Sequence, residues 1–250
     1  MEVDKTEENT AKKLAILRKW IDEAENIVFF GGAGVSTESG IPDYRSNNGI
    51  YRRKYGVPAE TILSHTYFIR HPVDFYSFYR EVMVHREAEP NQAHLKLAQM
   101  EGKGKLLSIV TQNIDGLHQA AGSKTVYELH GSVQRNYCES CGDFFDFDYI
   151  KNSEGVPTCS KCGGYVKPDV VLYEEGLDQD TINGAVRAIA AADVLIIGGT
   201  SLAVYPAAGL IDYFKGDKLV VINKAPTPRD KFADLLIQAP IGEVLGAVVV

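Results

Sequence analysis

The sequence predicts an α/β protein in which a parallel sheet is covered by helices on both faces and is interrupted by a small second module. Short apolar runs of the kind found in buried parallel strands alternate with segments of helical periodicity along most of the chain. This alternation stops in residues 133–168, which hold two C-x-x-C pairs. With 250 residues, the chain is long enough for one sizeable core or a core plus a small module.

The first half of the chain predicts a helix, a strand, a helical insertion and a second strand. Residues 10–25 place apolar side chains at helical spacing, and residues 27–30 form a short apolar run. Residues 58–88 are rich in aromatic side chains and predict a helical insertion. Asn91 is a good N-cap for the next helix. The remaining expected strands are 106–110, 126–129, 194–197, 219–222 and 235–238, with a helix over 181–192 and a short apolar helix or strand after Gly242.

We expect two domains built from discontinuous segments. The larger one, which holds the parallel sheet, takes residues 1–45, 89–133 and 169–250. The smaller one combines the helical insertion 46–88 with the cysteine-containing segment 134–168. Ligands of such sheets bind beyond the carboxyl ends of the strands. The polar motifs fall at those ends, at residues 31–34, 112–115, 130, 198–201 and 223.

Composition narrows the classes of partner. The net charge is −7, from 26 basic and 33 acidic side chains, and this balance argues against nucleic acid as a partner because phosphate contacts need a basic surface.

The polar first nine residues lack the apolar stretch of a signal peptide. The long uncharged run 194–211 is broken by glycine and proline, so no membrane span is expected. The lack of a signal-peptide stretch and of an expected membrane span favours a cytoplasmic protein.

The four cysteines predict a structural zinc ion. Cys138 and Cys141 form one C-x-x-C pair, Cys159 and Cys162 form the other, and 17 residues separate the pairs. Four thiolates on two tight turns suit tetrahedral zinc and leave no position for a substrate water. A redox C-x-x-C is the alternative, but two pairs in a strand-rich insertion fit it poorly.

A glycine-rich turn follows the first strand. Gly32 and Gly34 let the backbone approach a ligand closely, and free N–H groups at such a turn bind phosphate. The dinucleotide fingerprint is incomplete, because position 37 is not glycine and no acidic residue ends a second strand about 20 residues further on. The turn alone therefore leaves two interpretations open, a nucleotide site and an ordinary tight strand-to-helix turn.

The longer stretch is more specific. Residues 32–45 read Gly-Ala-Gly-Val-Ser-Thr-Glu-Ser-Gly-Ile-Pro-Asp-Tyr-Arg, which resembles the signature of the sirtuins, the NAD-dependent protein-lysine deacylases. Later stretches at 111–118, 128–132 and 199–202 agree, and the match runs from about residue 12 to the end in the expected order. The chain looks like a short, bacterial-type, single-module member. The resemblance implies a Rossmann-like NAD-binding domain, a zinc ribbon with one structural zinc, and acyl-lysine peptides or proteins as substrates.

The resemblance also implies a mechanism. The acyl-lysine oxygen attacks the nicotinamide ribose, and His130 acts as the general base that activates a ribose hydroxyl. Asn113 and Asp115 complete the implied catalytic set, and His118 is expected to lie behind it. The products are deacylated lysine, nicotinamide and O-acyl-ADP-ribose. The implied cofactor contacts are Gly32, Ala33, Gly34, Asp43, Tyr44, Arg45, Gln112, Asn113, Asp115, Gly199, Thr200, Ser201, Asn223 and Ile241, and the implied peptide contacts are Val171, Leu172, Tyr173, Val204 and Tyr205.

Three departures from the family pattern carry further expectations. Residues 173–175 read Tyr-Glu-Glu where Phe-Gly-Glu is common, which suggests a preference for basic residues flanking the acyl-lysine. Residues 239–241 read Ala-Pro-Ile where Gly-Asp or Gly-Cys is frequent, so only backbone contact with adenine is expected. Desuccinylating members carry Tyr-x-x-Arg; here Tyr76 is followed by Tyr79, and Arg80 should point elsewhere on the helix. We therefore expect neutral acyl groups rather than succinyl. The loop 45–56 is expected to be mobile without cofactor.

Three rival functions remain. Protein mono-ADP-ribosyltransferase activity uses the same cofactor and is separated only by its products. A dehydrogenase is disfavoured by the incomplete fingerprint. A non-catalytic module that binds through its zinc ribbon is opposed by the acidic balance and by His130.

Overall fold

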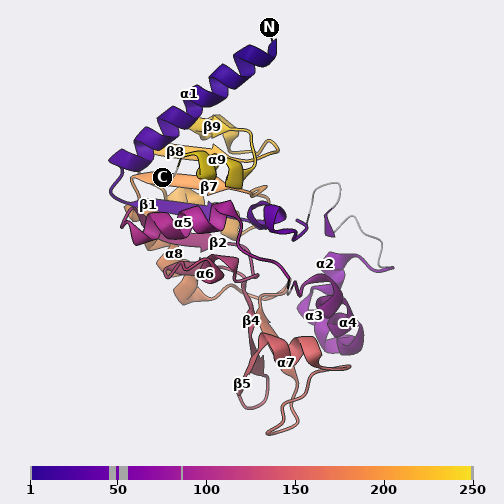
Figure 1. The fold of residues 1–250 in the computed structure, drawn as a ribbon. Coiled ribbons are helices and arrows are strands. Elements are labelled where there is room, and N and C mark those ends of the chain that lie inside the picture. The colour runs from indigo at the N-terminus through magenta and orange to yellow at the C-terminus, as the bar shows by residue number, and fades with distance from the viewer. Residues whose placement is uncertain (1, 45–48, 51–55, 86, 249–250) are drawn as a thin grey trace.

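A six-stranded parallel sheet forms the larger part of the protein. The computed structural model describes residues 2–44, 49–50, 56–85 and 87–248 (Figure 1). The strand order is β3-β2-β1-β7-β8-β9. Central strands are apolar at every position because helices cover both faces. The fold class expected from the sequence is thus confirmed. The strands are β1 (Ile27–Gly31), β2 (Leu106–Thr111), β3 (Val126–Glu128), β7 (Val194–Gly198), β8 (Lys218–Ile222) and β9 (Leu235–Ile237).

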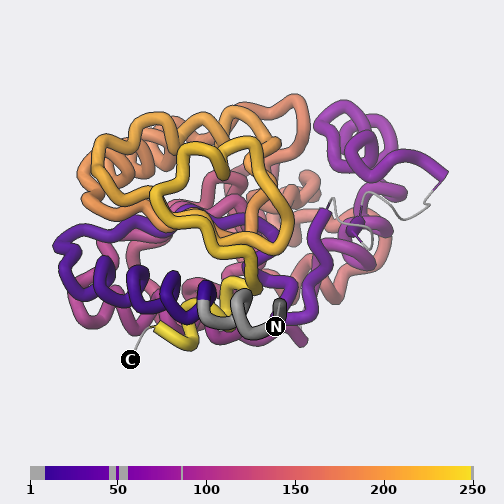
Figure 2. Tube along the Cα trace, turned by 90° about the horizontal axis from the view of Figure 1, so that it is seen from above, coloured from indigo at the N-terminus to yellow at the C-terminus, as the bar shows by residue number. Residues whose placement is uncertain are grey.

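Two layers of helices sandwich this sheet (Figure 2). One layer comprises α1 (Glu2–Glu23), α5 (Gln92–Gly102) and α9 (Ile241–Val248), which share a core with one face of the sheet. The other layer comprises α8 (Gln179–Ala191) and the 3-10 helix η3 (Ala207–Tyr213). The short helices α6 (Leu117–Ala120) and η4 (Asp230–Phe232) complete this part. The apolar tail is therefore a helix.

Local sequence signals explain where several helices begin. Asn91 caps α5, because its side chain accepts from Ala93 N–H while His94 Nδ1 accepts from Asn91 N–H. Asp178 caps α8 in the same way by accepting from Thr181 N–H at 2.8 Å. Helix α1 begins at residue 2 rather than at residue 10, and the periodic apolar stretch contributes Leu17 and Ile21 to the core.

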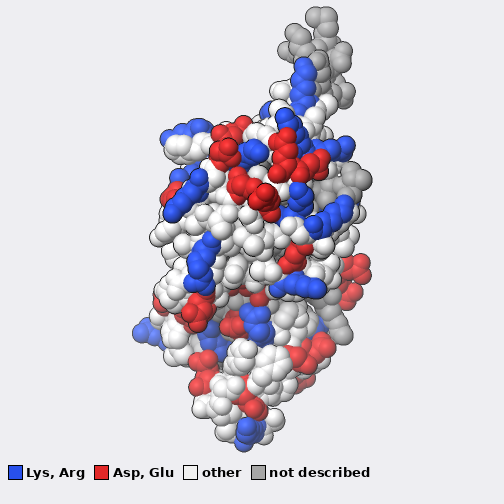
Figure 3. Space-filling view, turned by 90° about the vertical axis from the view of Figure 1, so that its left-hand side faces the viewer, with Lys and Arg blue, Asp and Glu red and all other residues white. Residues whose placement is uncertain are grey.

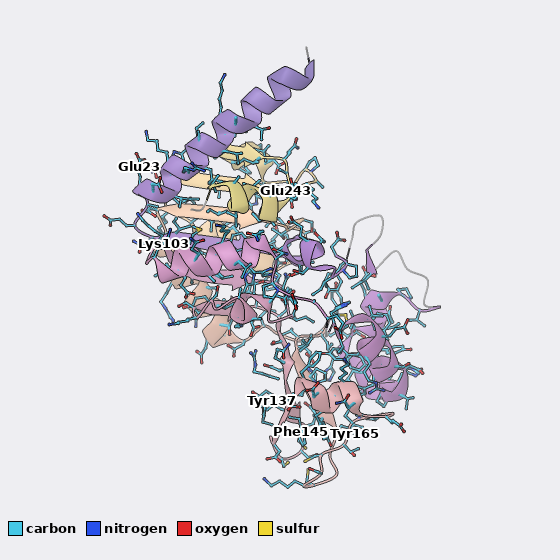
Figure 4. The ribbon with its side chains drawn as sticks, viewed as in Figure 1. Glu23, Lys103, Tyr137, Phe145, Tyr165 and Glu243 are labelled. Atoms are coloured by element: carbon cyan, nitrogen blue, oxygen red, sulfur yellow. The ribbon has the colours of Figure 1, made fainter. Side chains whose placement is uncertain are left out.

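The second part of the protein combines three helices with a small antiparallel sheet. The helices are α2 (Ala59–Ile62), α3 (His65–Arg70) and α4 (Pro72–Val82). The sheet has the order β5-β4-β6, with β4 (Gly131–Cys138), β5 (Phe144–Asp146) and β6 (Val166–Val170), and α7 (Phe147–Asn152) follows β5. Figure 4 shows Tyr137, Phe145 and Tyr165 at the end of this part that lies away from the larger sheet.

One apolar core joins the helices α2–α4 to the small sheet. The buried aromatic side chains of α4 lie in the same cluster as Val166 of β6 and two of the four cysteines. The hydroxyl of Tyr76 donates to Val166 O at 2.5 Å, which links the two segments directly. Strands β4 and β6 run across positions 133/134 and 168/169, so the two parts are connected by continuous strands.

The order in which successive strands are added to the sheet reverses between β1 and β7. Strand β1 pairs with β2 on one side and with β7 on the other, all parallel. The carboxyl ends of these three strands therefore face the same edge, where the following loops diverge and leave a crevice. Immediately after β1 the chain forms the 3-10 helix η1 (Ala33–Ser39), which ends at Gly40 in the left-handed conformation. None of the helices in the described part of the chain is long and apolar enough to span a membrane.

Candidate active site

A cavity of about 760 Å³ opens at the carboxyl edge of the large sheet. Its walls come from the loops after β1, β2, β7 and β8 and from residues 170–175, at the end of β6 and just after it. This size lies within the range of sites for small molecules and cofactors. The cavity therefore brings together the motifs that the sequence places far apart.

The floor of the cavity is formed by two glycine-containing turns in direct contact. Gly34 N–H donates to Gly199 O at 2.7 Å. A Cβ atom at Gly34 would lie 2.7 Å from that same oxygen, so only glycine lets the turns approach this closely. Gln112 Nε2 donates to Thr200 Oγ1 at 3.0 Å and fixes the second turn. Residues 32–34 and 199–201 all line the cavity. Backbone N–H groups at such turns suit a diphosphate.

His130 lies in the cavity wall at the end of β3. Its Nδ1 is 3.0 Å from Gln112 O. Because a carbonyl oxygen only accepts, Nδ1 carries the proton and Nε2 keeps a free lone pair. Burial lowers the pKa of His130 below its ordinary value, more than the hydrogen bond to Gln112 raises it. The imidazole is thus neutral at neutral pH and able to take a proton.

Gly131 allows His130 to sit between the two sheets. Its φ is +74°, in the left-handed region, and a Cβ atom there would lie 1.9 Å from Asp169 O on β6. No side chain fits without a shift of the β6 backbone. The His-Gly pair in the sequence is therefore explained by the close approach of β4 and β6 at this point.

A second polar cluster lies beside the main cavity. Ser36 Oγ donates to Asp115 Oδ2 at 2.7 Å and accepts from Asn113 Nδ2 at 3.0 Å. Asp115 Oδ1 accepts from Leu117 N–H at 2.9 Å. Asn113 lines the main cavity and also an adjoining cavity of about 30 Å³, whereas Asp115 lines only the smaller one. Ser36 belongs to the glycine-rich motif, and its role becomes visible only through these contacts.

Two buried histidines lie behind this cluster. The rings of His94 and His118 are 4.8 Å apart. Burial lowers the pKa of His94 to about 4, against an opposing effect of the Asp115 charge. Burial and the neighbouring His94 lower the pKa of His118 to about 3. Both side chains are therefore neutral, and neither ring nitrogen of His118 has a hydrogen-bond partner among the described residues. His118 does not line either cavity.

The segment after β6 forms an edge of the cavity that is anchored to α3. Tyr173 N–H donates to Leu63 O and His65 N–H donates to Tyr173 O, each at 3.0 Å. Val171, Leu172 and Tyr173 line the cavity. Across it lie Val204 and Tyr205, which also line it. The five residues expected to contact peptide are thus brought to one opening.

Both glutamates of this segment form contacts within the protein, but Glu175 is the one that pairs with a lysine. Glu174 has φ +76°, where the family pattern places glycine, and its carboxylate accepts from Thr66 N–H at 2.9 Å. The Glu175 carboxylate contacts Lys167 Nζ at 3.2 Å and Leu172 N–H at 2.8 Å. Although burial opposes it, these contacts and His65 lower the pKa of Glu175. The expected preference for basic residues beside the acyl-lysine therefore rests on exposed Glu174 alone.

Part of the cavity lining is apolar. This apolar part includes Leu63, Met83, Ile114, Val170 and Leu172. Arg80 donates to Ser153 Oγ at 3.2 Å and to Gly155 O at 2.8 Å. Arg80 therefore points away from the cavity, as its helical position predicts. Tyr76 is buried and does not line the cavity either. The tyrosine that matches the first position of the Tyr-x-x-Arg pattern is therefore a core residue in this protein. Leu63 and Met83 were missed, because helical periodicity cannot show which residues face a distant segment.

The remaining expected cofactor contacts are divided between the described and undescribed residues. Asp43 and Tyr44 line the cavity after η1. Asn223 and Ile241 line its opposite end, after β8 and at the start of α9. Arg45 and most of the loop 45–56 lie outside the described residues.

The four cysteines converge at the tip of the small sheet. Their sulfur atoms all lie within 4.8 Å of one another, with 3.4 Å between Cys138 and Cys162 and 3.7 Å between Cys141 and Cys159. Zinc–sulfur bonds of about 2.3 Å in a tetrahedron place sulfurs about 3.8 Å apart. The donor set therefore fits one zinc ion with a closed shell, as the sequence predicts.

Comparison with known proteins identifies the family. The Sir2 family model matches residues 32–206. An "NAD-dependent protein deacetylase" of Clostridium acetobutylicum is 60% identical over 240 residues, which cover 95% of this chain and 98% of that protein. A Sir2 structure with a deacetylated p53 peptide and 3′-O-acetyl ADP-ribose superposes with a TM-score of 0.86 at 39% identity, covering 94% of this chain and 96% of the other. A structure of Sir2Tm bound to a propionylated peptide gives a TM-score of 0.84 at 38% identity, covering 94% and 97%. This chain therefore belongs to the Sir2 family.

Proposed function

We propose that this protein is an NAD-dependent protein-lysine deacetylase. The observation that carries the proposal is that one cavity is lined by His130, by both glycine turns and by the segments Val171–Tyr173 and Val204–Tyr205. A diphosphate cradle and a peptide edge on either side of one neutral imidazole suit a reaction between a dinucleotide and a lysine side chain. The family membership and the names of close relatives support it.

The role of each catalytic side chain follows from its contacts. NAD, when bound, supplies an electrophilic ribose carbon and a neutral leaving group. His130 takes a proton from a ribose hydroxyl at Nε2, because Nδ1 is committed to Gln112 O. Asn113 and Asp115 hold the ribose and the nicotinamide carboxamide, with Ser36 fixing both side chains in advance.

The cofactor lies across the floor of the cavity in this proposal. The glycine turns at 32–34 and 199–201, together with Gln112, contact the diphosphate and the adjacent ribose. Asp43 and Tyr44, which line the cavity, contact the cofactor as well, and Arg45 stays a proposed contact. Asn223 and Ile241 contact the adenosine half from the opposite end. The acyl-lysine peptide adds as a strand between residues 171–173 and residues 204–205.

The acyl group of the substrate lies against the apolar part of the cavity lining. Leu63, Met83 and Ile114 offer no partner for a carboxylate there, and Arg80 is held by Ser153 and Gly155. A buried, unpaired acyl carboxylate would be costly. We therefore propose acetyl and other neutral acyl groups as substrates. The relative solved with a propionylated peptide is consistent with this choice.

We propose the same division into domains that the sequence suggests, with the helices α2–α4 and the zinc module as one small domain. Their common apolar core supports it. On the face shown in Figure 3, basic and acidic side chains are interspersed rather than segregated, which supports a protein or peptide substrate over nucleic acid. A cytoplasmic location stays a proposal.

Product analysis of three proteins tests the function. Wild type, His130→Ala and a control, His71→Ala, would be incubated with an acetyl-lysine peptide with and without NAD⁺. Because His71 is exposed and outside the cavity, wild type and the control should release the acetyl group only with NAD⁺. His130→Ala should lose turnover by about 10²–10⁴-fold while still binding NAD⁺. A protein-bound ADP-ribose adduct would point to the transferase instead. NAD⁺ left unconsumed by zinc-loaded wild type would overturn the proposal.

A further inference from the structure

The end of the cavity opposite His130 holds the adenosine half of the cofactor, on the proposed function. The glycine turns after β1 and β7 mark the centre of the cavity. His130 and Asn113 lie on the β2 and β3 side of this centre. Residues 222–226, at the end of β8 and after it, and residues 239–241, after β9, line the cavity on the other side. A dinucleotide with its diphosphate at the centre therefore places its adenosine ribose beside residues 223–226.

The charge at that end is positive. Lys224 is exposed and lines the cavity. Its ammonium group forms no ion pair or hydrogen bond with the residues that the structure describes. The carboxylates of described residues that line the cavity belong to Asp43, Glu174 and Glu175, on segments after β1 and β6. The segments after β8 and β9 contribute none to the lining. Nearby Arg229 is committed to Asp212 at 2.7 Å and does not line the cavity.

The turn that carries Lys224 is held in place. Asn223 Nδ2 donates to Ala225 O at 2.8 Å, which closes the turn around Lys224. Asn223 N–H donates to Ile237 O at 3.1 Å, which ties the start of the turn to β9. The backbone beneath the lysine is therefore fixed while its ammonium group stays free to meet a ligand.

This arrangement differs from that of dinucleotide sites that reject a phosphorylated ribose. Such sites place an acidic side chain against the ribose 2′-hydroxyl, whereas sites that accept a 2′-phosphate place a basic one nearby. We propose that Lys224 makes the adenosine subsite accept a 2′-phosphate, so that NADP⁺ binds in the cavity and competes with NAD⁺. Lys224 is then the residue that allows the cavity to accept both dinucleotides.

Calorimetric binding of ADP-ribose and 2′-phospho-ADP-ribose tests this without relying on turnover. Wild type should bind the two ligands with dissociation constants within about threefold of each other. Lys224→Glu should weaken 2′-phospho-ADP-ribose by about tenfold or more and ADP-ribose by less than threefold, because charge reversal acts on the added phosphate. The matched control is Lys231→Glu. That lysine is exposed on the same connection, lies over the Phe232 ring at 4.9 Å, and does not line the cavity.

The outcomes separate this proposal from the function on which it rests. ADP-ribose that binds wild type while the 2′-phosphorylated ligand binds more than 30-fold more weakly overturns the role of Lys224 and leaves the function intact. Equal weakening of both ligands by Lys224→Glu also overturns it, since the lysine would then serve the diphosphate. The same selective loss in Lys231→Glu would assign the effect to the general field of the loop. Failure of ADP-ribose itself to bind would contradict the proposed function.

Discussion

Acid should destabilise this protein through the buried pair of His94 and His118. An unfolded histidine has a pKa near 6.5, whereas burial lowers the pKa of His118 to about 3 and that of His94 to about 4. Between these values the unfolded chain binds protons that the folded protein does not. The unfolding free energy is therefore undiminished by this pair above pH 6.5, and it decreases as the pH falls toward 4. Linkage gives a loss of about 2 kcal/mol for each histidine between pH 7 and pH 5, about 4 kcal/mol together.

The substitution His118→Leu should remove half of this acid sensitivity. Neither ring nitrogen of His118 has a partner in the described part of the protein, so a leucine of similar volume breaks no hydrogen bond. We expect the unfolding free energy at pH 7 to stay within about 1 kcal/mol of wild type. The loss between pH 7 and pH 5 should fall from about 4 to about 2 kcal/mol.

Urea unfolding followed by tryptophan fluorescence measures this change. The only tryptophan, Trp20, packs against the core of the large sheet and so reports on the part that contains the histidine pair. Any effect of pH on the zinc module is common to both proteins and cancels in their difference. His71→Leu, at an exposed position, should leave the pH slope unchanged. Parallel pH curves for wild type and His118→Leu would refute the reasoning.

Three further perturbations address the zinc module, the His-Gly turn and the polar cluster. Cys159→Ser should abolish zinc binding, which elemental analysis measures. The near-ultraviolet dichroism of the small module should be lost as well, because zinc binding contributes on the order of 10 kcal/mol to the folding of that module. Dichroism equal to that of wild type would count against this prediction. Gly131→Ala should lower the urea unfolding free energy by about 2–4 kcal/mol, since its Cβ would meet Asp169 O at 1.9 Å; an unchanged midpoint would exclude that clash. Ser36→Ala should lower kcat/KM for NAD⁺ by about tenfold through the loss of its bonds to Asn113 and Asp115, and a wild-type value would dismiss the cluster.

The parts of the fold that local sequence determines could be predicted. Strands such as β1 and β7 are apolar at every position because they are buried on both faces, and this leaves a recognisable run. Asn91 and the two C-x-x-C pairs carry their meaning within a few residues. The carboxyl ends of parallel strands meet at one edge, so the positions of His130 and the glycine turns followed from the order of elements.

Contacts between distant segments could not be predicted in the same way. Met83 faces the cavity only because α4 packs on the small sheet, which no periodicity reveals. Glu175 looked like a free charge until β6 placed Lys167 3.2 Å from it. Ser36 gained a role only when β2 brought Asn113 and Asp115 beside it. In each case the missing information was the packing of two elements far apart in sequence.

The stoichiometry of a single reaction tests the central claim most directly. Zinc-loaded wild type would be mixed with excess acetyl-lysine peptide and limiting NAD⁺, and every product would be quantified by mass spectrometry. We predict one deacetylated peptide, one nicotinamide and one O-acetyl-ADP-ribose for each NAD⁺ consumed, because His130 directs the acetyl group onto the ribose rather than to water. Free acetate and ADP-ribose formed from the start, or deacetylation without nicotinamide release, would contradict it.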